Sequence, residues 1–192
     1  MEKLTGLKKE KTAVFISGNG SNLKNIIKFS KLKKSPISIN LIISNTYLAK
    51  GLKYANQFKI KKKVFDYKNF NSAEKKIIQL LNKEKIKFIC LAGFMKILSK
   101  KFIKKFNGTI INIHPSLLPK YKGINTHIRA IKNNDRFTGC TVHYVTEKLD
   151  SGKIIIQKKI KIAARDDAIT LAKRVLVEEH KLYPAAILKI FI

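Results

Sequence analysis

The chain has 192 residues, a length that suits one domain with a single hydrophobic core. Hydrophobic residues make up 45% of the sequence and are spread along it, which is typical of a globular protein and excludes a largely disordered chain. No apolar run approaches the roughly 20 residues that cross a bilayer, and the Lys-rich amino terminus lacks the apolar stretch of a secretory signal. These features predict a cytoplasmic protein with no membrane segment.

The net charge of +29 raises the question of a nucleic-acid partner, because dense positive charge attracts phosphate backbones. Almost all of this charge is lysine, whereas phosphate recognition favours the planar fork of arginine. Lys, Ile, Asn and Phe are abundant together, and their codons are rich in A and T. A nucleotide bias therefore explains the charge, and we expect no specific nucleic-acid partner.

The predicted elements alternate between strand and helix along the chain. A strand at 12–17 leads through a glycine loop at 18–22 into a helix that carries Leu23, Ile26 and Ile27 at helical spacing. The further predicted strands are 36–44, 63–67, 88–92 and 108–114, then an extended, antiparallel pair at 138–146 and 153–162. The further predicted helices are 48–59, 73–85, 125–133 and 166–181, with Pro184 ending or kinking the last one.

This alternation predicts an α/β fold with an open, mostly parallel twisted sheet and helices on both faces, a Rossmann-like architecture. We expect a single domain over residues 1–192, with 1–11 as an amino-terminal extension. Cys90 and Cys140 lack metal-ligand spacing and lie in apolar runs, so they are predicted to be small buried residues.

The glycine loop, Gly18-Asn19-Gly20-Ser21-Asn22, joins a strand to a helix. Position 23 is Leu, so the dinucleotide pattern G-x-G-x-x-G fails, and the chain has no triphosphate-binding G-x-x-x-x-G-K-[ST]. Two interpretations stay open from these residues. The loop is a tight turn, or its backbone N–H groups bind a monophosphate.

Asn112 and His114 are polar residues two apart in an otherwise apolar strand, so both side chains project from the same face. Pro115 ends that strand and places the pair at its carboxyl edge, where open α/β sheets bind ligands. An amide and an imidazole suit a carbonyl oxygen that gains negative charge in acyl transfer. Asp150 is the candidate third member, although Asp-Ser-Gly is also ordinary turn chemistry and a lone histidine is often structural.

Five ordered segments carry a resemblance to a known family. They are ISGNGSNL (16–23), LAGFMKILS (91–99), NIHPSLLPKYKG (112–123), VHYVTEKLDSG (142–152) and EEHKLYP (178–184). Together they resemble the folate-dependent phosphoribosylglycinamide formyltransferases, over residues 12–188. The resemblance implies formyl transfer from 10-formyltetrahydrofolate to the amine of glycinamide ribonucleotide in purine biosynthesis, with no metal. We expect a monomer or weak homodimer.

The resemblance also implies a role for each matching position. Asn112, His114 and Asp150 would be catalytic, Gly20, Ser21 and Asn22 would bind the substrate phosphate, and Glu179 would hold the ribose hydroxyls. Two segments would line the folate pocket: Met95, Lys96, Ile97 and Leu98, and Val145, Thr146, Glu147, Lys148, Leu149 and Asp150.

Two positions depart from the family pattern. Lys96 stands where many relatives carry Arg, which keeps the charge but loses the planar fork, and Asn125 stands where His is common. The rival functions are methionyl-tRNA formyltransferase and formyltetrahydrofolate hydrolase, which normally carry an additional domain that 192 residues do not accommodate. A nucleic-acid-binding module is the rival from another class, and it would favour clustered arginines with exposed aromatic residues.

Overall fold

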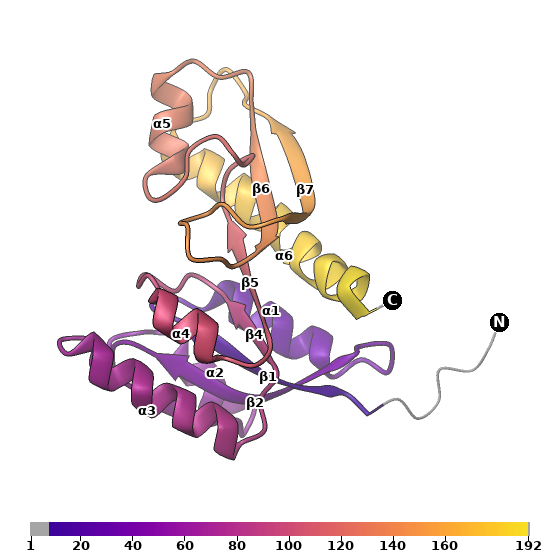
Figure 1. Cartoon of the computed structure of the whole chain (residues 1–192). Helices are drawn as coiled ribbons and strands as arrows, with labels where there is room; N and C mark the ends of the chain where they lie inside the picture. The colour runs from indigo at the N-terminus through magenta and orange to yellow at the C-terminus, as the bar shows by residue number, and fades with distance from the viewer. Residues whose placement is uncertain (1–7, 192) are drawn as a thin grey trace. The chain divides into compact units, whose positions relative to one another are not determined.

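The computed structural model describes residues 8–191, and its strands form one sheet in the order β3-β2-β1-β4-β5-β6-β7 (Figure 1). The described chain divides into two compact units, one running to Ile110 and including Phe191, the other Ile111–Ile190. The strand β5 (Thr109–His114) begins in the first unit, where Thr109 N donates to Lys87 O, and continues in the second. The predicted α/β class with an open, mostly parallel sheet is confirmed.

The first unit is a parallel sheet with helical connections. Its strands are β1 (Glu10–Ile16), β2 (Ile37–Ser44), β3 (Lys61–Val64) and β4 (Phe88–Leu91), and its helices are α1 (Ser21–Ser30), α2 (Leu52–Gln57), α3 (Phe70–Lys83) and α4 (Lys100–Lys105). The strand β1 pairs in parallel with β2 on one side and with β4 on the other. Four consecutive residues of β1, 13–16, are fully buried, as expected of a strand covered on both faces.

The second unit is an antiparallel ladder with two helices. The strand β6 (Phe137–Tyr144) pairs antiparallel with both β5 and β7 (Ile154–Lys161). The helices are α5 (Thr126–Lys132) and the long α6 (Ala168–Phe191). Tyr183 of α6 is fully buried, and its hydroxyl donates to Ile111 O of β5 at 3.3 Å, which ties this helix to the strand.

Several predicted boundaries were wrong. The last helix does not end at Lys181, because α6 continues through Pro184 to Phe191, and it begins at Ala168 after Asp167, whose carboxylate accepts from Thr170 N. A proline removes one backbone donor and need not stop a helix that is held by a buried face. The first strand begins at Glu10 and not at residue 12, so the last two residues of the predicted extension belong to the sheet; residues 1–7 of it lie outside the described part.

The short helix α4 was not predicted. Four of its six residues are lysine and only Phe102 is buried, so it has no apolar periodicity to detect. Both cysteines are confirmed as buried thiols. Within residues 8–191 no helix is long and apolar enough to cross a bilayer, and no cluster of His, Cys, Asp and Glu is arranged to hold a metal ion.

Candidate active site

The loop after β1 depends on a close approach between two glycines. Gly20, which precedes α1, has a φ of 73°, in the left-handed region. A Cβ at Gly20 would lie 2.6 Å from the Cα of Gly51, and Gly51 N donates to Gly18 O at 2.9 Å. No side chain caps α1 and its first turn carries no acid, so the loop keeps the backbone character that binds an anion at a helix start.

The loop after β4 starts beside the loop after β1. Ser17 N donates to Gly93 O at 3.0 Å, and Met95 N donates to the Ser17 hydroxyl at 2.7 Å. The chain runs from β1 to β2 on one side, whereas β4 lies on the other side of β1, so the two loops separate at the topological switch point of the sheet. Open α/β sheets bind ligands at this point.

The predicted folate segment 95–98 is anchored at both ends. The ring of Phe94 packs edge-on against Phe15 and Tyr67, with centroids 5.3 and 5.7 Å apart. At the other end Ser99 N donates to the carboxylate of the buried Glu74 at 2.9 Å, and the Ser99 hydroxyl donates to the same carboxylate. The segment is therefore fixed in position by groups that the sequence patterns did not single out.

The side chains of this segment divide into exposed and buried ones. Met95 is 68% exposed and Ile97 is 71% exposed, although the loop that carries them is anchored at both ends. Lys96 is exposed as well, whereas Leu98 is buried. In the other predicted folate segment Val145 is partly buried, and Thr146, Glu147, Lys148 and Leu149 are exposed.

In the second unit the ladder places four polar side chains on one face. Asn112 lies opposite His143, and His114 lies opposite Thr141, in the antiparallel pairing of β5 with β6. Directly opposite residues of an antiparallel pair project from the same face. The predicted pair of Asn112 and His114 is thus joined by His143, which sequence reasoning missed although it alternates with apolar residues in the same way.

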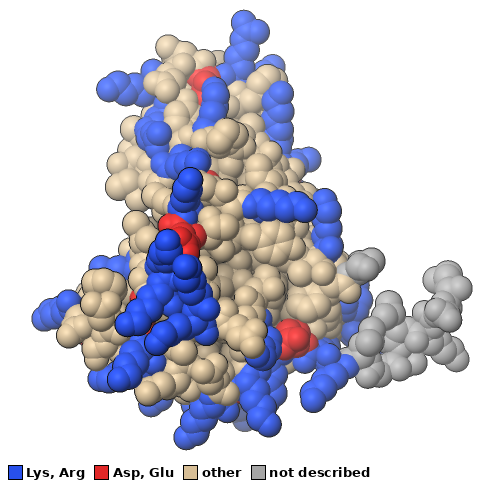
Figure 2. All heavy atoms as spheres, in the orientation of Figure 1, with Lys and Arg blue, Asp and Glu red and all other residues tan. Residues whose placement is uncertain are grey.

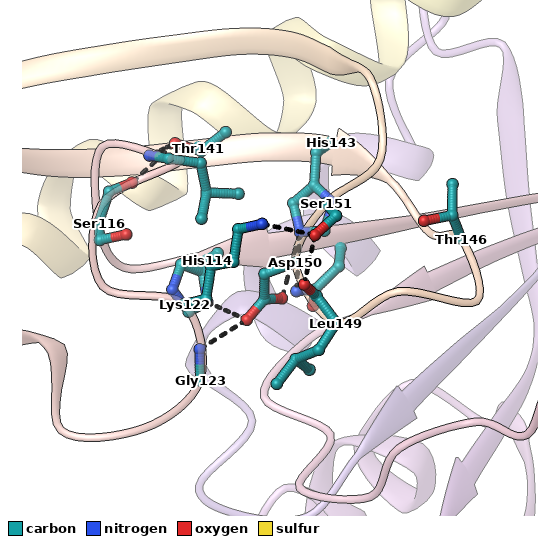
Figure 3. Close-up of polar contacts among 12 residues, drawn as sticks. His114, Ser116, Lys122, Gly123, Thr141, His143, Thr146, Leu149, Asp150 and Ser151 are labelled. Carbon is teal, nitrogen blue, oxygen red and sulfur yellow. Dashed lines mark hydrogen bonds and ion pairs between the residues drawn. The ribbon is translucent and has the colours of Figure 1, made fainter.

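Asp150 lies at the centre of these groups, in the turn before β7 (Figure 3). One carboxylate oxygen is 3.4 Å from His114 Nδ1 and accepts from Gly123 N at 2.8 Å, and the other is 3.6 Å from His143 Nε2. The side chains of His114, His143 and Asp150 are 6%, 3% and 7% exposed. Asp150 has a φ of 43°, so the turn is shaped to direct this carboxylate at both imidazoles.

The hydrogen bonds determine which atoms carry protons. His143 Nδ1 is 2.9 Å from the carbonyl of Tyr144, which only accepts, so the proton of His143 is on Nδ1. In the neutral ring His143 Nε2 accepts from Asn112 Nδ2, 3.2 Å away, whereas in the charged ring its N–H faces Asp150. An amide nitrogen has two N–H bonds, so Asn112 keeps a second one for another acceptor.

Both ring nitrogens of His114 face oxygen acceptors, because Nε2 is 2.8 Å from the carbonyl of Tyr121 and Nδ1 faces Asp150. Burial lowers the pKa of His114, and the Tyr121 carbonyl and Asp150 oppose that effect without cancelling it. Burial acts to raise the pKa of Asp150, but its contacts with His143, Gly123 and His114 outweigh burial and lower it overall. Asp150 is therefore a carboxylate at neutral pH.

The remaining predicted residues are placed as follows. Ser21 and Asn22 open α1, and Asn22 is buried. Glu179 is a buried acid of α6, 7% exposed, and burial together with Glu179 raises the pKa of Cys140 in β6 to about 12. His127 of α5 has a buried Nδ1 with no hydrogen-bond partner.

The sequence profile described as "Formyl transferase" matches residues 10–187, nearly the whole chain. The chain belongs to the formyl transferase family. This confirms the resemblance carried by the five sequence segments.

Individual members of the formyl transferase family agree with this assignment. The chain is 42% identical to the phosphoribosylglycinamide formyltransferase of Haemophilus influenzae, over 93% of this chain and 85% of that protein. It is 43% identical to the human trifunctional purine biosynthetic protein adenosine-3, over 94% of this chain but only 18% of that protein's length. The crystal structure of phosphoribosylglycinamide formyltransferase from Brucella melitensis superposes with a TM-score of 0.90 at 41% identity, covering 95% of this chain and 96% of the other.

Proposed function

We propose that this formyl transferase moves a formyl group from 10-formyltetrahydrofolate to the amine of glycinamide ribonucleotide, a step of purine biosynthesis. The observation that carries the proposal is the buried pair of His114 and Asp150 on the same sheet face as Asn112. Relatives named phosphoribosylglycinamide formyltransferase, about 40% identical over most of their length, support the same reaction.

The formyl carrier supplies an electrophilic carbonyl carbon. Met95 and Ile97 fit such a ligand, because they expose apolar surface for a ring system on an anchored loop. The carrier would also be held by Lys96 and Leu98 and by the turn from Val145 to Asp150. The phosphate of the other substrate would be bound by backbone N–H groups of Gly20, Ser21 and Asn22, and its ribose hydroxyls by Glu179.

In this mechanism the substrate amine is the nucleophile. A C–N bond forms to the formyl carbon while the bond from that carbon to the folate nitrogen breaks, and the amine proton moves to the leaving nitrogen. Asn112 donates its second N–H to the carbonyl oxygen as that oxygen gains charge. His114 contributes positive charge as an imidazolium whose two N–H bonds are directed at Asp150 and Tyr121 O, and Asp150 stabilises that charge and assists the proton transfer.

The remaining partner assignments are part of the same proposal. We expect a cytoplasmic enzyme that acts as a monomer or weak homodimer and binds no specific nucleic acid. Lysine and arginine project from many points of the face drawn in Figure 2, over several elements, which fits a compositional origin of the charge. Sedimentation velocity at several protein concentrations measures the oligomeric state.

The decisive experiment is an assay of the purified protein with 10-formyltetrahydrofolate and glycinamide ribonucleotide. We expect formylated product and tetrahydrofolate in equal amounts. Water and formylatable methionyl-tRNA are the alternative acceptors. Release of formate without formylated ribonucleotide, or transfer to the tRNA alone, would refute the proposed acceptor.

A further inference from the structure

The carbonyl that accepts from His114 belongs to Tyr121, a residue of the loop between β5 and α5. Tyr121 has a φ of 55°, a backbone conformation that residues with a Cβ rarely adopt. In that conformation its carbonyl oxygen lies 2.8 Å from His114 Nε2. Because an unfavourable conformation persists only where surrounding contacts determine it, the side chain of Tyr121 is the place to look for those contacts.

Three side chains from outside the loop contact Tyr121, in addition to Lys120 of the loop itself, whose Nζ lies 5.9 Å from the ring centroid. Its hydroxyl donates to one carboxylate oxygen of Asp135 at 2.6 Å and accepts from Asn133 Nδ2 at 3.0 Å. The guanidinium carbon of Arg129 lies 4.9 Å from the ring centroid, in a cation–π contact, while Arg129 Nη1 donates to Lys122 O at 2.8 Å. Each of the three contacts from outside the loop connects it to α5 or to the turn that follows α5.

Asp135 lies in that turn, just before β6. Its backbone N–H donates to Ala130 O at 3.0 Å, which fixes it to the end of α5. Its other carboxylate oxygen accepts from Lys120 Nζ at 3.0 Å. The hydrogen bond from Tyr121 lowers the pKa of Asp135, so the group that anchors the ring is a carboxylate at neutral pH.

We propose that Tyr121 and Asp135 are positioning residues for the proposed catalytic His114. The Asp135 carboxylate fixes the Tyr121 ring, the ring fixes the left-handed backbone, and the backbone presents the carbonyl to Nε2. Asp150 faces Nδ1 and this carbonyl faces Nε2, so each of the two N–H bonds of an imidazolium has an acceptor. A neutral imidazole has one N–H and can use only one of the two acceptors. The two residues thereby favour the charged ring although burial opposes it. The catalytic role of these two residues rests on the proposed function, whereas their effect on the protonation of His114 rests on the geometry alone.

The effect on His114 has a definite sign. Asp150 and the Tyr121 carbonyl favour its protonated form, while His143 from β6 and Arg129 and His127 from α5 disfavour it. Weakening the Tyr121 carbonyl contact removes one of the two favourable groups. As the pH rises, His114 of the variant then loses its proton at a lower pH than in the wild type. Activity that requires the imidazolium is lost at the same lower pH.

The test is an NMR titration of the His114 imidazole in the full chain without substrates, with the resonance assigned by a His114→Asn variant. In Tyr121→Phe, which removes only the hydroxyl, we expect the titration midpoint of His114 to move to lower pH. Asp135→Asn keeps a weaker acceptor, so a smaller shift in the same direction is expected. Tyr47→Phe is the matched control, because it removes the hydroxyl of an exposed tyrosine far along the chain from this loop, and it should not move the midpoint.

Steady-state kinetics complete the test. In Tyr121→Phe the high-pH limb of kcat should move in step with the NMR midpoint, while the KM of each substrate stays near wild type. A lower melting temperature with unchanged midpoints in both Tyr121→Phe and Asp135→Asn would mean a structural role only and would overturn the proposal. A shifted midpoint in a protein that forms no formylated ribonucleotide would instead refute the proposed function and leave the positioning role standing.

Discussion

The two units use opposite kinds of chemistry. The loop after β1 in the first unit offers backbone N–H groups and glycines, and residues 1–110 contain no histidine. All four histidines lie in the second unit, where His114, His143 and Asp150 form a buried polar cluster. Binding by backbone groups is insensitive to pH, whereas a buried charged pair is not. The comparison predicts that changes in the first unit alter binding and changes in the second alter turnover and its pH dependence.

Asp150→Asn should have the largest effect. The variant keeps the size of the side chain and tolerates the left-handed turn, but it removes the charge that faces His114 and His143. We expect kcat to fall by about 10²- to 10⁴-fold, with KM and melting temperature close to wild type. Asp166→Asn, which removes a carboxylate paired with Arg174 in the same unit, is the control for loss of charge. Near-normal turnover would return Asp150 to the role of a turn residue.

Asn112→Ala tests the proposed oxyanion donor of the second unit. Removal of one oxyanion donor costs roughly 10²- to 10³-fold in kcat, and the variant also leaves His143 Nε2 without its donor. Stopped-time assays at saturating substrates measure the loss, and Asn40→Ala in β2 is the control. If kcat is retained while KM rises, Asn112 binds the substrate and does not stabilise the oxyanion.

Gly20→Ala should change binding and stability in the first unit. The added methyl group would lie 2.6 Å from the Gly51 backbone and would sit at a left-handed φ, which costs about 1–2 kcal/mol from the backbone alone. We expect a lower melting temperature and a higher KM for the phosphorylated substrate. Gly18→Ala is a matched control, since a Cβ there meets no atom within 4 Å and the backbone is not left-handed. Equal behaviour of the two variants would contradict the argument from close approach.

The stability of the second unit should depend on pH in a defined direction. Burial lowers the pKa of His114, His127 and His180, so below the ordinary histidine pKa of about 6.5 the unfolded chain binds more protons than the folded one. Stability contributed by these neutral rings is present at higher pH and is lost as the pH falls through this window. Thermal melting between about pH 7.5 and about pH 5.5 should show a falling melting temperature, and His127→Asn should reduce the slope. A melting temperature that does not change over this pH range would contradict the prediction.

The smallest expected effect is the binding of DNA by the lysines, which occur in both units. If composition alone explains the charge, duplex DNA should bind without sequence preference, at roughly 10⁻⁴ to 10⁻⁶ M near physiological salt, and should be released by added salt. Fluorescence anisotropy with two unrelated duplexes measures this. Sequence-selective binding at physiological salt would show that the charge has a specific partner.

The sequence predicted those parts of the fold and site that leave a local pattern. Buried parallel strands such as β1 and β4 are short apolar runs, and Asn112 and His114 stand out at alternate positions of one. The contribution of His143 depends on the register between β5 and β6, which the local sequence does not specify. The acceptor for His114 is a backbone carbonyl, and every residue has one, so no residue type could have indicated Tyr121. The course of α6 past Pro184 likewise depends on its buried face.

The edge strands give the lysine content a further consequence. The sheet ends at β3, where residues 61–63 are all lysine and exposed, and at β7, where Lys158, Lys159 and Lys161 are exposed. An edge strand offers unpaired N–H and C=O groups to another chain, and lysines on it oppose that pairing by mutual repulsion. Two copies that approach edge to edge would bring like charges together on either side of the new ladder. A compositional bias towards lysine would therefore also oppose aggregation of this protein through the edges of its own sheet.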